Sequence, residues 1–393
     1  MMPSNATPDS NHPPRRRACA IPVRGLALGV AAGLLAACNT FHPPQFPPPV
    51  RTLLGALRTA IGDAWFARHG GDWRSLADNK ALQAHIGLGD DMGPLRASGP
   101  FLTLNGQRLY PAPANLMVQT EGGTAHYFLL GLGDVVHCDL GRVRLPAFPK
   151  QVPGVASLKG SKPASGWLTQ DAMQRLLDGQ VPRAGDLIPN QALFDEEPRL
   201  GIGRDNTRRS VQEGLLYQTR HLRLRPGVGV ELHLHGLPDA SLLPSRTTLR
   251  LGGEGRQAAL CTSLDATTNL PTASARIAPG ARFVLYHLTP SVCAPDVPAG
   301  IPAGFVRGHH EGADCWEGQL AGQRLRILSV ACARPLREGG WDLARHEARA
   351  VQSLLAPGSV LYAQHLGEQA LPCAAFSALA DATGRGLLLA GAL

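Results

Sequence analysis

The spacing of apolar residues predicts two main helices. Over residues 50–68 apolar side chains recur every three or four positions, which places Leu53, Leu57 and Ile61 on one helical face. A proline run at 47–49 suits a first helical turn, and Gly70-Gly71 ends the helix. The second helix is expected over 168–178, with Thr169 as N-cap and Gly179 behind it. A shorter helix is expected around 76–85.

Alternating apolar and polar positions predict strands in much of the remaining chain. Residues 101–104 and 107–110 flank Asn105-Gly106, the preferred pair for a two-residue type I′ turn, so they are expected to form a hairpin. Further strands are expected at 247–251, 283–288, 325–332, 359–363 and 387–390. Three helices among many strands indicate an α+β fold.

The stretch from Glu196 to His235 is the part of the sequence that most limits which functions the protein can have. Between Glu196 and Val230 it carries seven arginines against four acids. Leu222 and Leu224 alternate with basic residues, a Pro226-Gly227 turn follows, and residues 230–235 alternate again. We therefore expect an arginine loop at 199–209 that leads into a hairpin of residues 221–225 with 230–235. Its polar face would be exposed and would carry His233 and His235. Such a unit suits a phosphate backbone.

Composition is compatible with two domains or one large one. The chain has 393 residues, 44% of them hydrophobic, with 45 glycines and 33 prolines. Its net charge is +8, and only four of the 38 basic residues are lysine. The arginine excess either reflects base composition of the genome or serves polyanion binding, for which the planar guanidinium is well suited.

The first 45 residues indicate export, whereas the cysteines indicate a reducing compartment. Three arginines at 15–17 precede an apolar run from Ile21 to Ala37 that ends at Cys38, which is the pattern of a lipoprotein export signal. The eight cysteines are dispersed and form no Cys-x-x-Cys pair, which favours free thiols in a reducing compartment.

No catalytic pattern stands out in the sequence. It contains neither a nucleophile elbow nor a Walker loop, and no acidic pair has a distinctive spacing. Residues 252–256, Gly-Gly-Glu-Gly-Arg, either cradle a phosphate with backbone N–H groups or make a tight turn. His233 and His235, with a ligand from His309-His310-Glu311, leave open a metal-dependent enzyme.

Seven collinear segments resemble one protein family, the third subunit of the type III-B CRISPR effector, the Cmr complex. They are FPPPVRTLLGALRTAIG (46–62), GPFLTLNGQRLYPAPANL (99–116), GWLT (166–169), EEPRLGIGRDNTRRSVQEGLLY (196–217), LRLGGEGRQA (249–258), GWDL (340–343) and APGSVLYA (356–363). This family belongs to the RAMP superfamily of RNA-binding CRISPR proteins.

The resemblance implies two ferredoxin-like (RRM-related) modules with long loop insertions. It also implies a cytoplasmic, non-catalytic protein without metal or cofactor. Such a subunit holds the 5′ repeat-derived tag of the guide RNA (crRNA) and docks the large polymerase-like subunit beside the backbone RAMP subunits. The expected phosphate-holding residues are Arg204, Arg208, Arg209 and Arg256, the glycines Gly252, Gly253 and Gly255, and, as weaker candidates, Arg51, Arg58, Lys159 and Lys162.

Residues 1–45 depart from the family, which carries its first strand there. Either this segment has diverged or the gene model has a wrong start or reading frame. The expected division is therefore an atypical segment at 1–45, one module at 46–195 and a second at 196–393. The alternative function is an exported lipoprotein or periplasmic binding protein anchored at Cys38.

Overall fold

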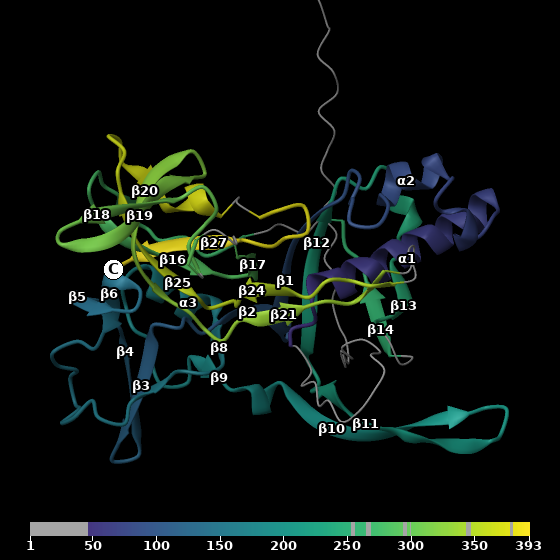
Figure 1. The fold of residues 1–393 in the computed structure, drawn as a ribbon, viewed down its shortest axis with the longest axis horizontal. Coiled ribbons are helices and arrows are strands. Elements are labelled where there is room, and N and C mark those ends of the chain that lie inside the picture. Colours follow the sequence, from purple (N-terminus) through teal and green to yellow (C-terminus); the bar gives the residue numbers. More distant parts are fainter. Residues whose placement is uncertain are drawn as a thin grey trace, which may run out of the picture.

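The computed structural model describes residues 46–252, 256–264, 269–293, 297–298, 300–342, 347–377 and 380–393. These residues form many strands and few helices, arranged as two halves side by side with a long two-stranded ribbon beneath one of them (Figure 1). The predicted α+β class is confirmed. The signal-like run and Cys38 lie outside the described residues, as do Gly253 and Gly255. No helix within these ranges is long and apolar enough to cross a membrane.

The long predicted helix is present as α1 (Val50–His69). Its apolar face is buried, and Gly70 ends it with a φ of 77°. The shorter predicted helix is α2 (Lys80–Ile86), and the Asn79 side chain caps it by accepting a hydrogen bond from the Leu82 N–H at 2.9 Å. It begins later than expected because residues 76–78 form a turn after a short 3₁₀ helix at 73–75, and Asn79 is the N-cap.

The first sheet packs against α1 and has the strand order β12-β1-β2-β8-β9. Its strands are β1 (Arg96–Leu104), β2 (Gln107–Pro111), β8 (Trp167–Thr169), β9 (Leu187–Ile188) and β12 (Val228–His235). The predicted turn between β1 and β2 is confirmed, with positive φ at Asn105 (51°) and Gly106 (80°).

The predicted hairpin around Pro226-Gly227 is wrong. Strand β12 pairs antiparallel with β1, while β11 (Ser210–Leu224) pairs with β10 (Phe194–Asp205) to form the ribbon. The physical reason is burial. Pairing with β1 brings Val230, Leu232 and Leu234 into the core beneath α1, which a free two-stranded hairpin does not provide.

The second half contains an antiparallel sheet with the order β18-β19-β20-β25-β16-β27. Its strands are β16 (Arg282–His287), β18 (Val306–His310), β19 (Ala313–Leu320), β20 (Gln323–Ala331), β25 (Val360–His365) and β27 (Leu388–Ala392). Helix α3 (Gln170–Leu177) packs against β27, and its buried face joins the larger core. The four strands predicted in this half are confirmed.

Shorter strands surround these two sheets. They are β3 (Leu116–Glu121), β4 (Thr124–Leu129), β5 (Gly131–Cys138), β6 (Gly141–Ala147), β7 (Lys162–Pro163), β13 (Arg246–Arg250), β14 (Gln257–Cys261), β15 (Arg276–Ile277), β17 (Ser291–Val292), β21 (Leu336–Glu338), β22 (Trp341–Asp342), β23 (Glu347–Ala348), β24 (Gln352–Leu355) and β26 (Leu371–Pro372). The strand predicted at 247–251 corresponds to β13.

The two halves exchange elements across residue 196, where the sequence suggested a module boundary. Strand β12 follows that position but completes the sheet of the first half. Helix α3 precedes it but packs in the core of the second half. Hydrogen bonding and packing therefore run across the expected boundary.

Candidate RNA-binding surface

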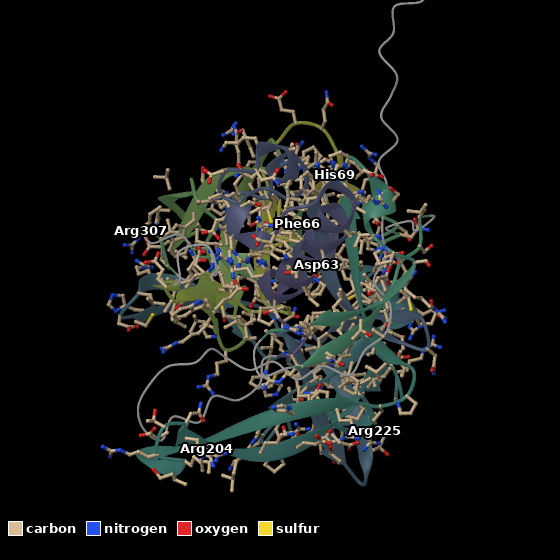
Figure 2. All side chains as sticks on the ribbon, turned by 90° about the vertical axis from the view of Figure 1, so that its right-hand side faces the viewer. Asp63, Phe66, His69, Arg204, Arg225 and Arg307 are labelled. Carbon is tan, nitrogen blue, oxygen red and sulfur yellow. The ribbon has the colours of Figure 1, made fainter. Side chains whose placement is uncertain are left out.

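The β10–β11 ribbon carries the arginine-rich segment and extends away from the body of the protein (Figure 1). Phe46 packs against Phe194 with ring centroids 4.7 Å apart and the rings tilted by 58°, so the ribbon starts beside the residues that precede α1. The expected arginine loop at 199–209 is part of the ribbon itself, with its turn at residues 206–209. Figure 2 shows Arg204 towards the far end and Arg225 at the root.

Arginines in the stem of the ribbon are paired with acids on the opposite strand. Arg220 contacts Glu196 at 2.9 Å, Arg223 contacts Glu197 at 2.5 Å and Arg225 contacts Asp195 at 2.8 Å. Hydrogen bonds from Arg223 and then Arg199 lower the pKa of the Glu197 carboxyl. No acidic pair stood out in the sequence, but Glu196 and Glu197 are the residues that neutralise the stem arginines.

Arginines at the tip lack such partners. Arg204 and Arg209 make no ion pair with another residue in the described ranges, and Arg208 is 84% exposed with its Nε 3.9 Å from an Asp205 oxygen. Asp205 instead accepts backbone N–H bonds from Thr207 and Arg208, which fixes the turn. The structure thus brings Arg204, Arg208 and Arg209 together at the tip.

Apolar side chains also lie exposed along the outer ribbon. They are Leu200, Ile202 and Val211, which are among the most exposed large aliphatic residues of the described chain. Sequence reasoning missed them, although their position beside the arginines was visible. Their exposure means that the outer ribbon is not stabilised by a core of its own.

The first turn of α1 gathers a second group of candidates. Arg51 pairs with Asp90 at 3.1 Å, and its Nε lies 3.8 Å from buried Glu338. Glu338 in turn pairs with Arg385, in the loop before β27. Gly252 has a φ of 68° and lies against Thr52, because a Cβ at Gly252 would stand 3.5 Å from the Thr52 methyl group. This group therefore joins both halves of the protein.

Arg58 is directed inward from the same helix. Its guanidinium donates hydrogen bonds to the carbonyl oxygens of Gly89 (2.9 Å) and Asp91 (3.4 Å). Burial and then the neighbouring charge of Arg349 lower the pKa of the Arg58 guanidinium. Arg349 follows β23 and was not identified from the sequence, where nothing links it to α1.

The remaining candidates do not join these groups. Arg256 is buried and contacts the His221 ring at 2.9 Å. Lys159 and Lys162 are exposed, and Lys162 lies on β7 beside β3, far along the molecule from the ribbon tip (Figure 1).

The expectation that His233 and His235 lie on an exposed face is wrong. His233 is 0% exposed, and its Nε2 lies 2.7 Å from both a Glu231 oxygen and an Arg108 nitrogen. Arg108 also donates to Glu231 at 2.8 Å and 3.1 Å. His235 is partly buried. The pattern was misread because β12 joins the sheet beside β1, where the Arg108 side chain from β2 reaches across β1 to Glu231 and His233. In the described ranges no three His, Cys, Asp or Glu residues form a group that could hold a metal ion.

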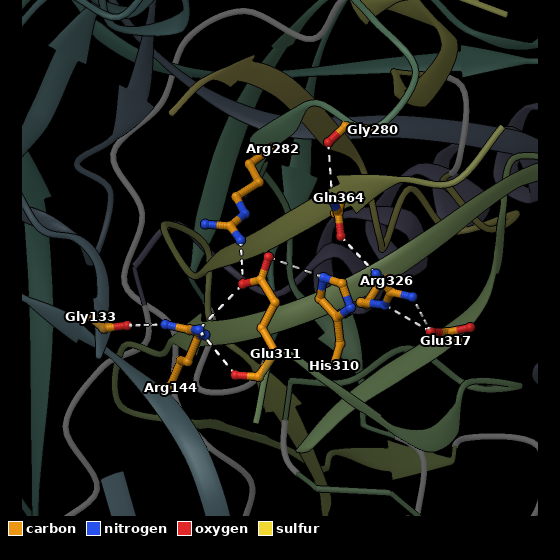
Figure 3. A network of polar contacts seen from close by, with 9 residues as sticks. All are labelled: Gly133, Arg144, Gly280, Arg282, His310, Glu311, Glu317, Arg326 and Gln364. Carbon is orange, nitrogen blue, oxygen red and sulfur yellow. Dashed lines mark hydrogen bonds and ion pairs between the residues drawn. The ribbon is translucent and has the colours of Figure 1, made fainter. Parts of the chain in front are cut away.

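His310 and Glu311, the other residues considered as ligands, belong to a separate polar network on the second sheet (Figure 3). Glu311 occupies the turn between β18 and β19 with a φ of 49°. Its carboxylate is held by Arg282 at 2.6 Å and Arg144 at 3.3 Å. The network ties β6 to the edge of the six-stranded sheet.

Comparisons with known proteins gave one family and a set of solved structures. The model of the family described as CRISPR-associated protein (Cas_Cmr3) matches residues 43–393. Two of the similar solved structures are cryo-EM structures of "the Type III-B Cmr-beta bound to cognate target RNA", one of them also with AMPPnP. Each aligned chain is 15% identical, with 87% of this chain and 86% of that chain covered and a TM-score of 0.41. The comparison with curated proteins gave no match.

Proposed function

Because the chain belongs to the CRISPR-associated Cas_Cmr3 family, we propose that it is a non-catalytic, guide-RNA-binding subunit of a type III-B Cmr effector. Within that complex it holds the 5′ tag of the crRNA and docks the large polymerase-like subunit and the backbone RAMP subunits. It acts in the cytoplasm in antiviral defence. The family match favours this proposal over an exported lipoprotein.

One observation carries the RNA-binding part of the proposal, namely the distribution of arginines along the ribbon. The stem arginines are neutralised by carboxylates, whereas Arg204, Arg208 and Arg209 at the tip face solvent. The guanidiniums of Arg204 and Arg209 can take phosphate oxygens without first breaking an ion pair, and that of Arg208 has only a long contact of 3.9 Å with Asp205 to give up. The proposal therefore locates the main phosphate contact at the tip.

We also propose that the two halves are ferredoxin-like modules with insertions. The packing of a helix against an antiparallel sheet in each half supports this assignment. In this view the ribbon, β3–β7 and β21–β24 are insertions. The exchange of α3 and β12 between the halves makes the two modules a single packed unit.

The test replaces Arg204, Arg208 and Arg209 together with Ala in the full chain. Affinity for single-stranded RNA should fall, and the slope of log affinity against log salt should flatten by about 2, since each single-strand phosphate contact contributes about 0.7. Binding would be measured by fluorescence anisotropy across a salt series.

The matched control replaces Arg220, Arg223 and Arg225 in the stem of the same ribbon, which removes the same charge. This control should keep most of the affinity and the salt slope. If the tip variant binds RNA as tightly as wild type, or if the tip and stem variants lose equal affinity, the result would count against the tip as the phosphate contact.

A further inference from the structure

Asp90 holds together two arginines from opposite halves of the protein. It lies in the loop between α2 and β1, and one of its oxygens contacts both Arg51 of α1 and Arg349 of the second half. Arg349 also reaches Asp342 at 2.9 Å. A single carboxylate thus occupies the space between two guanidiniums.

The exposure of the three groups is uneven. The side chains of Arg51 and Arg349 are 29% and 20% exposed, whereas that of Asp90 is 71% exposed. Next to Asp90, Gly89 has a φ of 60°, and a Cβ added there would meet no other atom within 4 Å. The carboxylate is therefore a solvated group on a glycine-containing loop. Exposed ion pairs of this kind are weak and easily exchanged.

The arginines around Asp90 repel one another. Burial and then the charge of Arg349 lower the pKa of Arg58. Burial and then the charge of Arg51 lower the pKa of Arg385 to about 10. These guanidiniums lie close together, and the Asp90 carboxylate between Arg51 and Arg349 relieves part of the repulsion.

We propose that Arg51 and Arg349 form a phosphate-binding site that the Asp90 carboxylate closes until an RNA phosphodiester displaces it. The inference rests on the proposed function, since it assumes that RNA is the ligand. Carboxylate and phosphate offer guanidinium the same planar pair of acceptor oxygens, so one can replace the other. The site lies at the start of α1, and Arg51 is five residues after Phe46, which packs against Phe194 at the root of the ribbon.

At such a site the Asp90 carboxylate competes with the RNA phosphate for the two guanidiniums. A phosphate must displace Asp90, so contacts elsewhere on the RNA have to bring it into place first. Removing the competing carboxylate should therefore raise RNA affinity, whereas removing one of the arginines should lower it. The effects of the two substitutions on RNA affinity should be non-additive, because both act at one site.

The test measures affinity of the full chain for a fluorescein-labelled single-stranded RNA with Asp90→Asn, Arg349→Ala and the double variant. Asp90→Asn should bind about two- to fivefold more tightly, the range expected for loss of an exposed ion pair. Arg349→Ala should bind more weakly, with the salt slope flattened by about 0.7. In the double variant the gain from Asp90→Asn should disappear.

The matched control is Glu311→Gln, which removes an exposed carboxylate that likewise lies between two arginines, on the second sheet (Figure 3). It should leave RNA affinity unchanged. An equal gain in this control would show a general charge effect and overturn the proposal. So would an Asp90→Asn variant that binds no more tightly, or a gain that persists with Arg349→Ala.

These outcomes separate the inference from the proposed function. If the Asp90 and Arg349 variants match wild type while the ribbon-tip variant loses affinity, the phosphate site is refuted and RNA binding stands. If wild type and every variant fail to bind RNA, the proposed function fails. A thermal melt of each variant verifies that it is folded.

Discussion

Glu231, Arg108 and His233 form a buried polar group in the first sheet, next to the apolar residues that β1 and β12 supply to the core. Burial alone would raise the pKa of Glu231, but hydrogen bonds from His233 and Arg108 lower it to about 2. The carboxylate therefore stabilises the fold above pH 4.5. That contribution is lost as the pH falls from about 4.5 to about 2.

Replacing Glu231 with Gln should lower the free energy of unfolding by about 3 kcal/mol, because it leaves the Arg108 charge buried without its counter-ion. Urea denaturation would measure the change. The control is Glu368→Gln at an exposed position, where the change should stay within about 0.5 kcal/mol. A Glu231→Gln variant as stable as wild type would contradict this account.

His287 should make the protein sensitive to mild acid. Burial lowers the pKa of this imidazole to about 4. In the unfolded chain it takes up a proton near pH 6.5, so between pH 6.5 and 4 the unfolded state binds more protons. Stability should fall with pH in this window by up to about 1.4 kcal/mol per pH unit.

Urea titrations between pH 7 and pH 5 would measure this dependence. His287→Asn should be less stable at pH 7 but should lose less stability on acidification than wild type. An identical pH dependence in both proteins would assign the effect to other histidines.

Among the helices and strands, α3 connects the two halves. The Thr169 side chain caps its first turn. The Thr169 hydroxyl accepts a hydrogen bond from the Ala172 N–H at 3.2 Å. Thr169→Ala should lower the free energy of unfolding by about 1 kcal/mol, and Thr169→Ser should be nearly neutral. Equal stability of both variants in thermal denaturation would argue against a capping role.

Local signals predicted the elements well, because their causes are local. Helix α1 follows from apolar spacing between a proline run and Gly70-Gly71, and the β1–β2 turn follows from Asn105-Gly106. Strand partners were not predictable in this way. The Pro226-Gly227 turn reverses the chain, but which strand β12 joins depends on a core built by distant residues.

The residues of the candidate site likewise divide into those whose grouping follows from local sequence and those whose grouping depends on distant residues. The ribbon-tip arginines are close in sequence, so their grouping could be predicted. Arg349 and Arg385 reach α1 only through tertiary packing, and nothing near them in sequence indicates it. Burial also changed the interpretation of His233 and Arg256, whose partners come from other strands.

At the scale of the whole molecule, the exchange of α3 and β12 predicts that the halves do not fold separately. A fragment of residues 46–195 lacks β12, which covers one edge of β1 and supplies part of the core beneath α1. A fragment of residues 196–393 lacks α3. Each alone should show little near-ultraviolet circular dichroism, and mixing them should restore a native spectrum. A native-like spectrum from either fragment alone would contradict this prediction.

The placement of β12 has a consequence for how the protein is made. About 130 positions separate the end of β1 from the end of β12. A ribosome adding roughly 5–20 residues per second needs roughly 7–26 s to cover that interval. During this time the nascent chain presents β1 with an open edge, which is a template for unwanted strand pairing. We expect the yield of soluble protein to depend on translation speed and on chaperones that shield the emerging chain.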